Sequence, residues 1–420
     1  MSNNGRKFTV KVGHNPYDDA DFTADCPNYP FLPTILPKVE RIIVMGDIHG
    51  DYSVAIKSFQ IAKLIDDNLN WIAIPKNTIV VQVGDQIDSC RPIPNVVNCR
   101  KPNPGDIGED MKVMAFFDEM HKKAIIHGGA VYSLIGNHEL LNSQGNFNYV
   151  SYENLENFKY NPNPTDPKSK TYLGSHGRDD AFAPGGDAAK MMACGRNSVM
   201  IIGSNIFAHA GILPPVIQYL NYLAVDDRTK LKYLNSIVRK WLLNKLTTKE
   251  QTDNVNKIVN DINGIFWTRK FGTINENNHL DAPDCIEVKD TLDIFKVGQI
   301  IVGHSPQFCY KKKDGRSGIN GTCHDVHQKK RLYRVDNGLS RAFDLFRNDP
   351  NVVQVLEILD DTHFNIITDS GIIPTHELDD SIFVPEEKEK VAEQYGPGRV
   401  HTIYGGMEII DIDFASDSQI

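Results

Sequence analysis

The sequence predicts an α/β fold built on a mostly parallel sheet, because apolar runs of strand length alternate with segments of helical periodicity. Three such runs, at 41–45, 78–83 and 130–135, each stop at a glycine. After the first run, apolar residues recur at near-helical spacing over about fifteen positions. A helix is also expected between the second and third runs, with Val113, Phe117, Met120 and Ala124 on its apolar face.

The remaining elements follow in chain order from the same patterns. Further strands are expected at 198–202, 206–208, 299–302, 331–335 and 352–358, and one or two amphipathic helices between 226 and 263. Loops or insertions are expected at 142–170, 174–188 and 311–323. Five prolines and little periodicity predict an irregular N-terminal arm at 1–38, a main domain at 39–361 and a C-terminal extension at 362–420.

Composition excludes several classes of function. The 420 residues carry 45 basic and 54 acidic side chains, a net charge of −9, so no bulk attraction draws the chain to nucleic acid. No apolar run has the length of a signal peptide core or a membrane span, which predicts a soluble, cytoplasmic protein without a membrane partner. The seven cysteines are odd in number and spread over the chain, which is not typical of a disulfide scaffold. No CxxC occurs, so zinc fingers and thioredoxin-type redox chemistry have no support.

Polar residues of the types that bind metals follow almost every predicted strand. Because ligands bind at the carboxyl ends of strands in open α/β sheets, these side chains are expected to share one pocket. A single Asp or His after a strand is most often structural, whereas five such strand ends in sequence order favour a common site. The segments are Gly46-Asp47-Ile48-His49, Gly84-Asp85-Gln86-Ile87-Asp88, Gly136-Asn137-His138-Glu139, Ala208-His209 and Gly303-His304.

The residue types indicate the chemistry. Asp, Asn and His suit Mn, Fe or Zn, and a carboxylate placed between two cations can bridge them. Two such cations activate water and bind a phosphate during in-line attack. The site therefore predicts a phosphoester hydrolase with two divalent metal ions.

With these motifs, the chain resembles the calcineurin-like metallophosphoesterases, within them the phosphoprotein phosphatase group, and in particular its Shewanella-like (Shelph) branch. The resemblance covers about residues 40–358, which makes 39–361 the expected catalytic domain. It implies a four-layer fold in which two mixed β-sheets lie between layers of helices. The motifs that carry it are Val81-Gln82-Val83-Gly84-Asp85-Gln86, Gly136-Asn137-His138-Glu139, Ala181-Phe182-Ala183-Pro184-Gly185-Gly186, Phe207-Ala208-His209-Ala210-Gly211, Phe266-Trp267-Thr268-Arg269, Val302-Gly303-His304-Ser305-Pro306 and Val335-Asp336-Asn337-Gly338.

The resemblance also implies a role for each residue. Asp47 and His49 would bind the first metal, Asp85 would bridge, and Asn137, His209 and His304 would bind the second. His138 would be the general acid, oriented by Asp88, and the nucleophile would be a hydroxide that bridges the metals. A phosphoprotein or phosphopeptide would be the substrate, with phosphate removed from Ser, Thr or Tyr.

One position departs from the family pattern. The family has an arginine that binds phosphate directly after the second Asp of GDxxD, and this chain has Ser89 there. Because a guanidinium binds phosphate far better than a hydroxyl, Arg91, Arg100 or another arginine must take the role, or activity is reduced. Arg269 is the first candidate, and Arg178 is a weaker one.

Alternatives stay open at this point. Hydrolysis of a small phosphoester or a dinucleoside polyphosphate is a second enzymatic hypothesis, and a scaffold with weakened catalysis is a third, suggested by Ser89 alone. Cys90 and Cys99 flank a loop beside the site and are expected to be reduced, with a regulatory disulfide as the alternative. Cys309, Cys323, His324 and His327 have the spacing of a second zinc site, for which a simple hairpin is the favoured interpretation. Oligomeric state is open.

Overall fold

A computed structural model describes residues 19–375 apart from 167, 221–222, 224, 308–317 and 347–352, together with 401–404 and 407–410. Two mixed β-sheets dominate it, as the resemblance implies. The three apolar runs that open the sequence pattern become parallel neighbours in the larger sheet. That seven-stranded sheet has the order β13 (Gly371–Pro374), β12 (His363–Thr368), β11 (Gln354–Leu359), β2 (Arg41–Met45), β3 (Ile79–Gln82), β4 (Ala130–Leu134) and β5 (Arg196–Asn197).

The second sheet has six strands and faces the first. Its order is β1 (Ile35–Leu36), β6 (Val199–Ile202), β7 (Asn205–Ala208), β8 (Gln299–Val302), β10 (Lys330–Arg334) and β9 (Asn320–His324). β7, β8 and β10 run parallel, while β9 and β10 form an antiparallel pair. A separate two-stranded sheet pairs β14 (His401–Tyr404) with β15 (Met407–Ile410).

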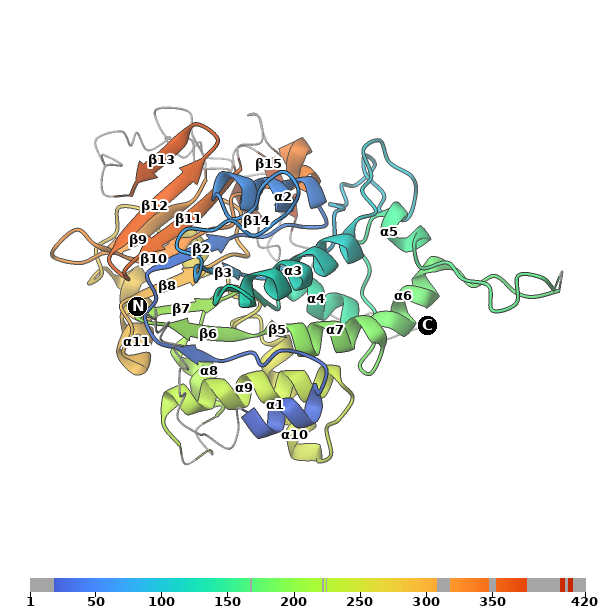
Figure 1. Ribbon diagram of the computed structural model, residues 1–420, viewed down its shortest axis with the longest axis horizontal. Helices are drawn as coiled ribbons and strands as arrows, with labels where there is room; N and C mark the ends of the chain where they lie inside the picture. The colour runs from blue at the N-terminus through green and yellow to red at the C-terminus, as the bar shows by residue number, and fades with distance from the viewer. Residues whose placement is uncertain are drawn as a thin grey trace, which may run out of the picture.

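Helices cover the outer faces of the two sheets. In Figure 1, α2 lies above β2 and β3, and α9, α1 and α10 lie below β6 and β7. None of the described helices is long and apolar enough to cross a membrane. The helices are α1 (Asp19–Asp25), α2 (Tyr52–Ile61), α3 (Asp110–Ile125), α4 (Asn137–Ser143), α5 (Tyr152–Glu156), α6 (Gly174–Phe182), α7 (Asp187–Gly195), α8 (Pro214–Gln218), α9 (Asp227–Leu242), α10 (Lys249–Asn260) and α11 (Ile286–Phe295), with 3₁₀ turns η1 (Phe271–Thr273), η2 (Pro283–Cys285) and η3 (Arg341–Phe346).

The alternation of side chains along β2 explains the layers. Ile42 and Val44 point into the core between the sheets, which also holds apolar residues of β6, β7 and β8. Ile43 and Met45 point to the opposite face and pack with residues of α2 and α3. Because both faces of this strand are buried, its sequence is a continuous apolar run rather than an alternating one.

Some predicted segments differ from the structure. The loop expected at 174–188 contains α6 and the start of α7, because Arg178, Phe182 and Ala188 supply a buried helical face that the Gly-rich, charged composition conceals. Within the arm expected to be irregular, α1 is helical and β1 pairs with β6. Beyond the expected end of the main domain, β12 and β13 extend the larger sheet from β11.

Six cysteines form the disulfides Cys26–Cys194, Cys90–Cys99 and Cys285–Cys323. The expectation that the cysteines do not form a disulfide scaffold is therefore wrong, and so is the expectation that Cys90 and Cys99 are reduced. Two of these join residues 168 and 38 positions apart, so only the folded chain brings the partners together. Cys323 is therefore occupied and is no zinc ligand, and Cys309 lies outside the described residues. The favoured hairpin interpretation is confirmed by β9 and β10.

Candidate active site

The predicted metal ligands meet where the carboxyl ends of strands from the two sheets face each other. Asp47, Asp85 and Asn137 follow β2, β3 and β4 of the larger sheet, whereas His209 and His304 follow β7 and β8 of the smaller one. All of these side chains are buried, at 6% exposure or less. The expected gathering of strand ends is therefore confirmed, but it spans two sheets rather than one row of strands.

The second group of predicted ligands is complete. Atoms of Asp85, His209 and His304 lie within 4.8 Å of one another. Oδ1 of Asn137 lies 2.9 Å from both Nε2 of His209 and Nδ1 of His304. Four donor atoms from four strand ends thus point at one place.

The first group centres on His49. Its Nε2 lies 3.9 Å from Oδ2 of Asp85 and 4.0 Å from Oδ2 of Asp47. By distance alone, His49 and Asp85 also group with His138, within 4.8 Å. Oδ1 of Asp47 is buried without a hydrogen-bond partner among the described residues, which marks it as an atom awaiting a ligand.

Backbone carbonyls fix the orientation of the three histidine rings. Nδ1 of His49 donates to Ile87 O at 3.1 Å, and Nδ1 of His209 donates to Val83 O at 2.9 Å. Nε2 of His304 donates to Trp267 O at 3.0 Å. Each ring therefore holds its proton away from the site and turns a lone pair towards it, as metal-ligating histidines do. The donor set fits two divalent cations that accept N and O ligands.

Burial and mutual charge shift the acidities of these groups. Burial would raise the pKa of Asp85, but the charges of His209 and His138 outweigh it and hold that pKa well below its usual value. Burial raises the pKa of Asp47 well above the usual value, and the neighbouring carboxylates of Asp336 and Asp85 add to this. Carboxylates crowded together in a buried place need cations to compensate their charge.

The backbone adopts an uncommon conformation at several positions of the site. His49, Asp85, Asp88 and His304 adopt positive φ values of 44°, 54°, 72° and 67°, which non-glycine residues rarely do. Such residues cluster at functional sites, where surrounding contacts hold them. Gly136 has a different reason to be glycine, since a Cβ there would overlap Oδ1 of Asp85.

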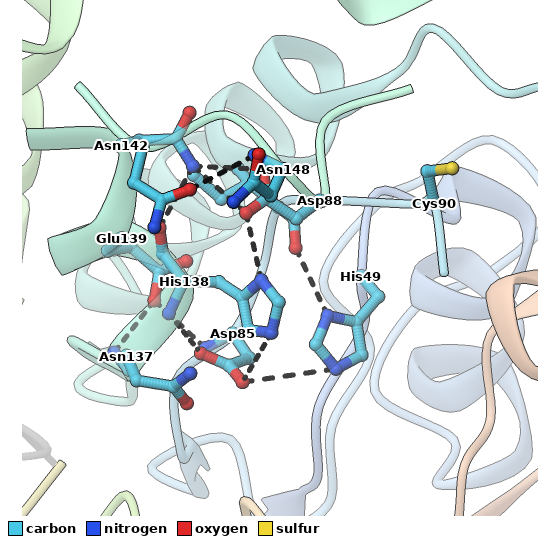
Figure 2. A network of polar contacts seen from close by, with 12 residues as sticks. His49, Asp85, Asp88, Cys90, Asn137, His138, Glu139, Asn142 and Asn148 are labelled. Carbon is cyan, nitrogen blue, oxygen red and sulfur yellow. Dashed lines mark hydrogen bonds and ion pairs between the residues drawn. The ribbon is translucent and has the colours of Figure 1, made fainter. Parts of the chain in front are cut away.

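His138 stands between two carboxylates (Figure 2). Its Nδ1 lies 2.8 Å from Oδ2 of Asp88, and its Nε2 lies 3.9 Å from Oδ2 of Asp85. Asn142, one turn further along α4, donates to both Asp88 oxygens at 2.9 and 3.0 Å. The predicted pairing of His138 with Asp88 is therefore present, and Asn142 fixes the carboxylate.

Arg178 lies behind this pair and does not face the site. The side chain is fully buried, and its Nη2 lies 2.7 Å from Asp110 and 3.4 Å from Asp88. Its Nε donates to Oδ1 of Asn142 at 2.7 Å. The interpretation of Arg178 as a phosphate ligand is therefore wrong, because the guanidinium is fully buried among Asp88, Asp110 and Asn142. It orients Asp88 instead.

Sequence reasoning missed several supporting residues. Both Glu139 oxygens accept backbone N–H groups, from Asp85 at 3.0 Å, Gln86 at 2.8 Å and Gly136 at 2.7 Å, which ties the ends of β3 and β4 together. Burial raises the pKa of Asp110, the partner of Arg178, to about 6. Glu139 directly follows His138 in the motif, and this position was the one sequence signal that could have indicated its supporting role.

Arg269 lies beside the second group of ligands. Its Nη1 donates to the carbonyl of His304 at 3.2 Å, and the side chain is exposed. Burial lowers the pKa of His304 well below its usual value, and the Arg269 charge lowers it further. Arg269 is thus near enough to act electrostatically on this end of the site.

Comparisons with known proteins agree with this geometry. Residues 40–308 match the sequence profile of a family described as calcineurin-like phosphoesterase. An uncharacterized protein of Acanthamoeba polyphaga mimivirus is 51% identical over 257 residues, which are 61% of this chain and 98% of that protein. Shewanella-like protein phosphatase 2 of Arabidopsis thaliana is 27% identical, with 81% of each chain covered.

Solved structures show the same fold. A cold-active protein tyrosine phosphatase matches with a TM-score of 0.51 and 17% identity, covering 82% of this chain and 80% of that one. A second structure, from a psychrophilic Shewanella species, matches with the same TM-score and identity and covers 82% of both chains. At this identity the likeness concerns the arrangement of sheets and helices.

Proposed function

The chain belongs to the calcineurin-like phosphoesterase family, and on that premise we propose that it is a metal-dependent protein phosphatase acting on phosphoserine, phosphothreonine or phosphotyrosine. The observation that carries this proposal is the convergence of six buried donor residues, Asp85 among them, with His138 at their edge. The names of the relatives support a protein substrate, since two are Shewanella-like protein phosphatases.

The chain's residues would hold two divalent cations. Asp47 and His49 fit one of them, Asn137, His209 and His304 fit the other, and Asp85 lies between the two groups. Cations bound there would supply Lewis-acid activation of water and would stabilise charge on the phosphoryl oxygens. The ligand types admit Mn, Fe or Zn.

His138 is the proposed general acid. Asp88 accepts the hydrogen bond from Nδ1 and fixes the ring, so Nε2 is the atom that faces the site. A proton held at Nε2 would pass to the leaving oxygen of the substrate side chain. Asn142 and Arg178 also contact the Asp88 carboxylate and hold it in place.

Arg269 is proposed as a phosphate ligand at the end of the site near His304. A guanidinium there would stabilise charge that develops on the phosphoryl oxygens. Residues 39–361 remain the proposed catalytic domain, because they supply every residue named in this mechanism.

The location of the protein is a separate question. A cytoplasmic location stays a prediction, and the three disulfides of the described residues weigh against it, because disulfides persist in oxidising surroundings.

Substrate class is tested by initial rates on phosphotyrosine, phosphoserine and phosphothreonine peptides, with a dinucleoside tetraphosphate alongside. The proposal expects the phosphopeptides to be hydrolysed faster. A far higher rate on the dinucleoside would replace the protein substrate with a small molecule. No turnover on any of them, with two metals bound per chain, would favour an inert scaffold.

A further inference from the structure

Ser89 occupies the position at which the family carries a phosphate-binding arginine. Its hydroxyl forms hydrogen bonds within the protein. Its Oγ donates to Ile107 O at 2.9 Å and lies 3.2 Å from Nδ2 of Asn154. The side chain is buried at 8% exposure. Ser89 therefore fastens the loop before α3 and offers nothing to a substrate.

Arg91, two residues further on, is held beside the site. Its Nη1 donates to the carbonyls of Asp88 and Cys90, both at 2.9 Å. Its guanidinium carbon lies 4.4 Å from the ring centre of Phe343 and 5.8 Å from that of Tyr149. Arginine stacks on aromatic faces in this way, which restricts where the fork can point.

The two rings that hold Arg91 also touch the histidines of the site. The Phe343 ring centre lies 5.3 Å from that of His49, and the Tyr149 ring centre lies 5.0 Å from that of His138. The guanidinium is therefore placed at the side of the site where the predicted first metal and the predicted general acid lie.

Part of the Arg91 guanidinium is not used by the protein. No carboxylate among the described residues forms an ion pair with Arg91, and within this part of the chain its hydrogen bonds use Nη1 alone. The Nε and Nη2 donors are left for a ligand.

Other arginines near this loop do not fit. Arg100 is exposed and makes a backbone contact with Asn98, and Arg178 is buried against Asp110. Arg269 lies at the opposite end, beside His304. Arg91 is also anchored on a closed loop, because Cys90 forms a disulfide with Cys99 and its N–H donates to Tyr149 O at 3.0 Å.

The geometry points to Arg91 as a ligand of the substrate's phosphoryl group, taking the role that Ser89 cannot fill. This inference rests on the proposed phosphatase function. Two donors of one guanidinium can bind two phosphoryl oxygens at once, which a lysine in the same place cannot do. With Arg269 at the other end, the phosphate would be bound from both sides.

The test compares wild type, Arg91→Ala and Arg91→Lys, with Arg100→Ala as the control from the same loop. KM and kcat for p-nitrophenyl phosphate, the inhibition constant of inorganic phosphate, and the metal content are measured for each. Arg91→Ala is expected to raise KM and the inhibition constant about 10-fold or more, because charge-assisted hydrogen bonds are lost. Arg100→Ala should match wild type, and millimolar guanidinium should partly restore Arg91→Ala.

Unchanged phosphate inhibition in Arg91→Ala, with two metals bound, would overturn the inference. If Arg91→Ala does not fold, the inference is tested on Arg91→Lys, because lysine keeps the charge and the approximate length of arginine but lacks the two parallel donors of the guanidinium. An inhibition constant of phosphate equal to that of wild type in Arg91→Lys would also overturn the inference. If wild type shows no metal-dependent turnover, the proposed function fails instead. In that case the affinity for inorganic phosphate is measured by calorimetry on metal-loaded wild type and on metal-loaded Arg91→Lys. Equal affinities would contradict the inference about Arg91.

Discussion

Nδ1 of His138 lies 2.8 Å from Oδ2 of Asp88, and both side chains are buried. A carboxylate on one ring nitrogen fixes the position of the proton there and directs the other nitrogen towards the reacting groups. The pairing with Asp88 therefore gives His138 a role in moving a proton. This role differs from that of the residues that would bind metal.

Replacing His138 with Gln should therefore remove proton transfer and leave the metals in place. We expect kcat to fall about 10²- to 10⁴-fold, the usual contribution of general acid catalysis. Steady-state kinetics and metal analysis measure the two effects separately. His127→Asn, at an exposed histidine, is the control. A His138→Gln enzyme with wild-type kcat would assign the proton transfer to another group.

Arg178 predicts an effect on both stability and rate. Arg178→Met leaves the buried carboxylates of Asp110 and Asp88 without their cation, and we expect a loss of about 3–5 kcal/mol in the free energy of unfolding. The remaining folded enzyme should show a reduced kcat, because Asp88 loses its orientation. Urea unfolding and kinetics measure these effects, with Lys190→Met, at an exposed ion pair, as the control. Unchanged stability would show that Arg178 is not a structural cation.

The disulfides predict a measurable order of stability. Cys26–Cys194 closes a loop of 168 residues and Cys285–Cys323 one of 38. In the chain-entropy description, loss of the longer link costs about 1 kcal/mol more than loss of the shorter one. Denaturant unfolding of Cys194→Ser and Cys285→Ser compares them. Alkylation of the unfolded, unreduced chain should label one of the seven cysteines, and labelling of all seven would contradict the pairing.

The contact between α1 and α9 predicts a dependence on pH. Burial tends to raise the pKa of Asp21, but hydrogen bonds from Lys240 and Ser236 outweigh it and lower that pKa below the ordinary 3.8. The ionised carboxylate therefore contributes stability above pH 3.8, and the contribution is lost as pH falls through the lowered pKa.

Asp21→Asn should accordingly cost about 0.5–1 kcal/mol at pH 7, since the pair is partly exposed and screened. The difference from wild type should stay constant between pH 7 and 5 and shrink below pH 4. Denaturant unfolding of metal-free protein across this range measures it. A difference that grows on acidification would reverse the assignment.

The strands and the grouping of the candidate ligands could be predicted because their signals are local. Four of the five apolar runs that precede a candidate ligand end in a glycine, and all five are followed by Asp, Asn or His, so strand and candidate ligand share one short segment. β8 lies at the predicted 299–302. Parallel strands bring their carboxyl ends together, which made the gathering of Asp47, Asp85 and Asn137 predictable.

What the sequence did not disclose depends on contacts between distant segments. Arg178 looks like a charge in a glycine-rich loop, and only the packing of α6 against α4 buries it beside Asp88. Cys26 follows α1 and Cys194 lies in α7, and these two segments come together because both helices contact α9. The placement of Arg91 depends on Tyr149, which lies on a loop, and on Phe343, which lies in η3.

The central claim is a two-metal phosphoesterase centred on Asp85. It is tested most directly by hydrolysis of p-nitrophenyl phosphate by metal-stripped protein, with and without added manganese, beside Asp85→Asn and the exposed control Asp187→Asn. The account predicts manganese-dependent turnover in wild type and the control, and its loss in Asp85→Asn. Turnover without metal, or a fully active Asp85→Asn, would contradict it.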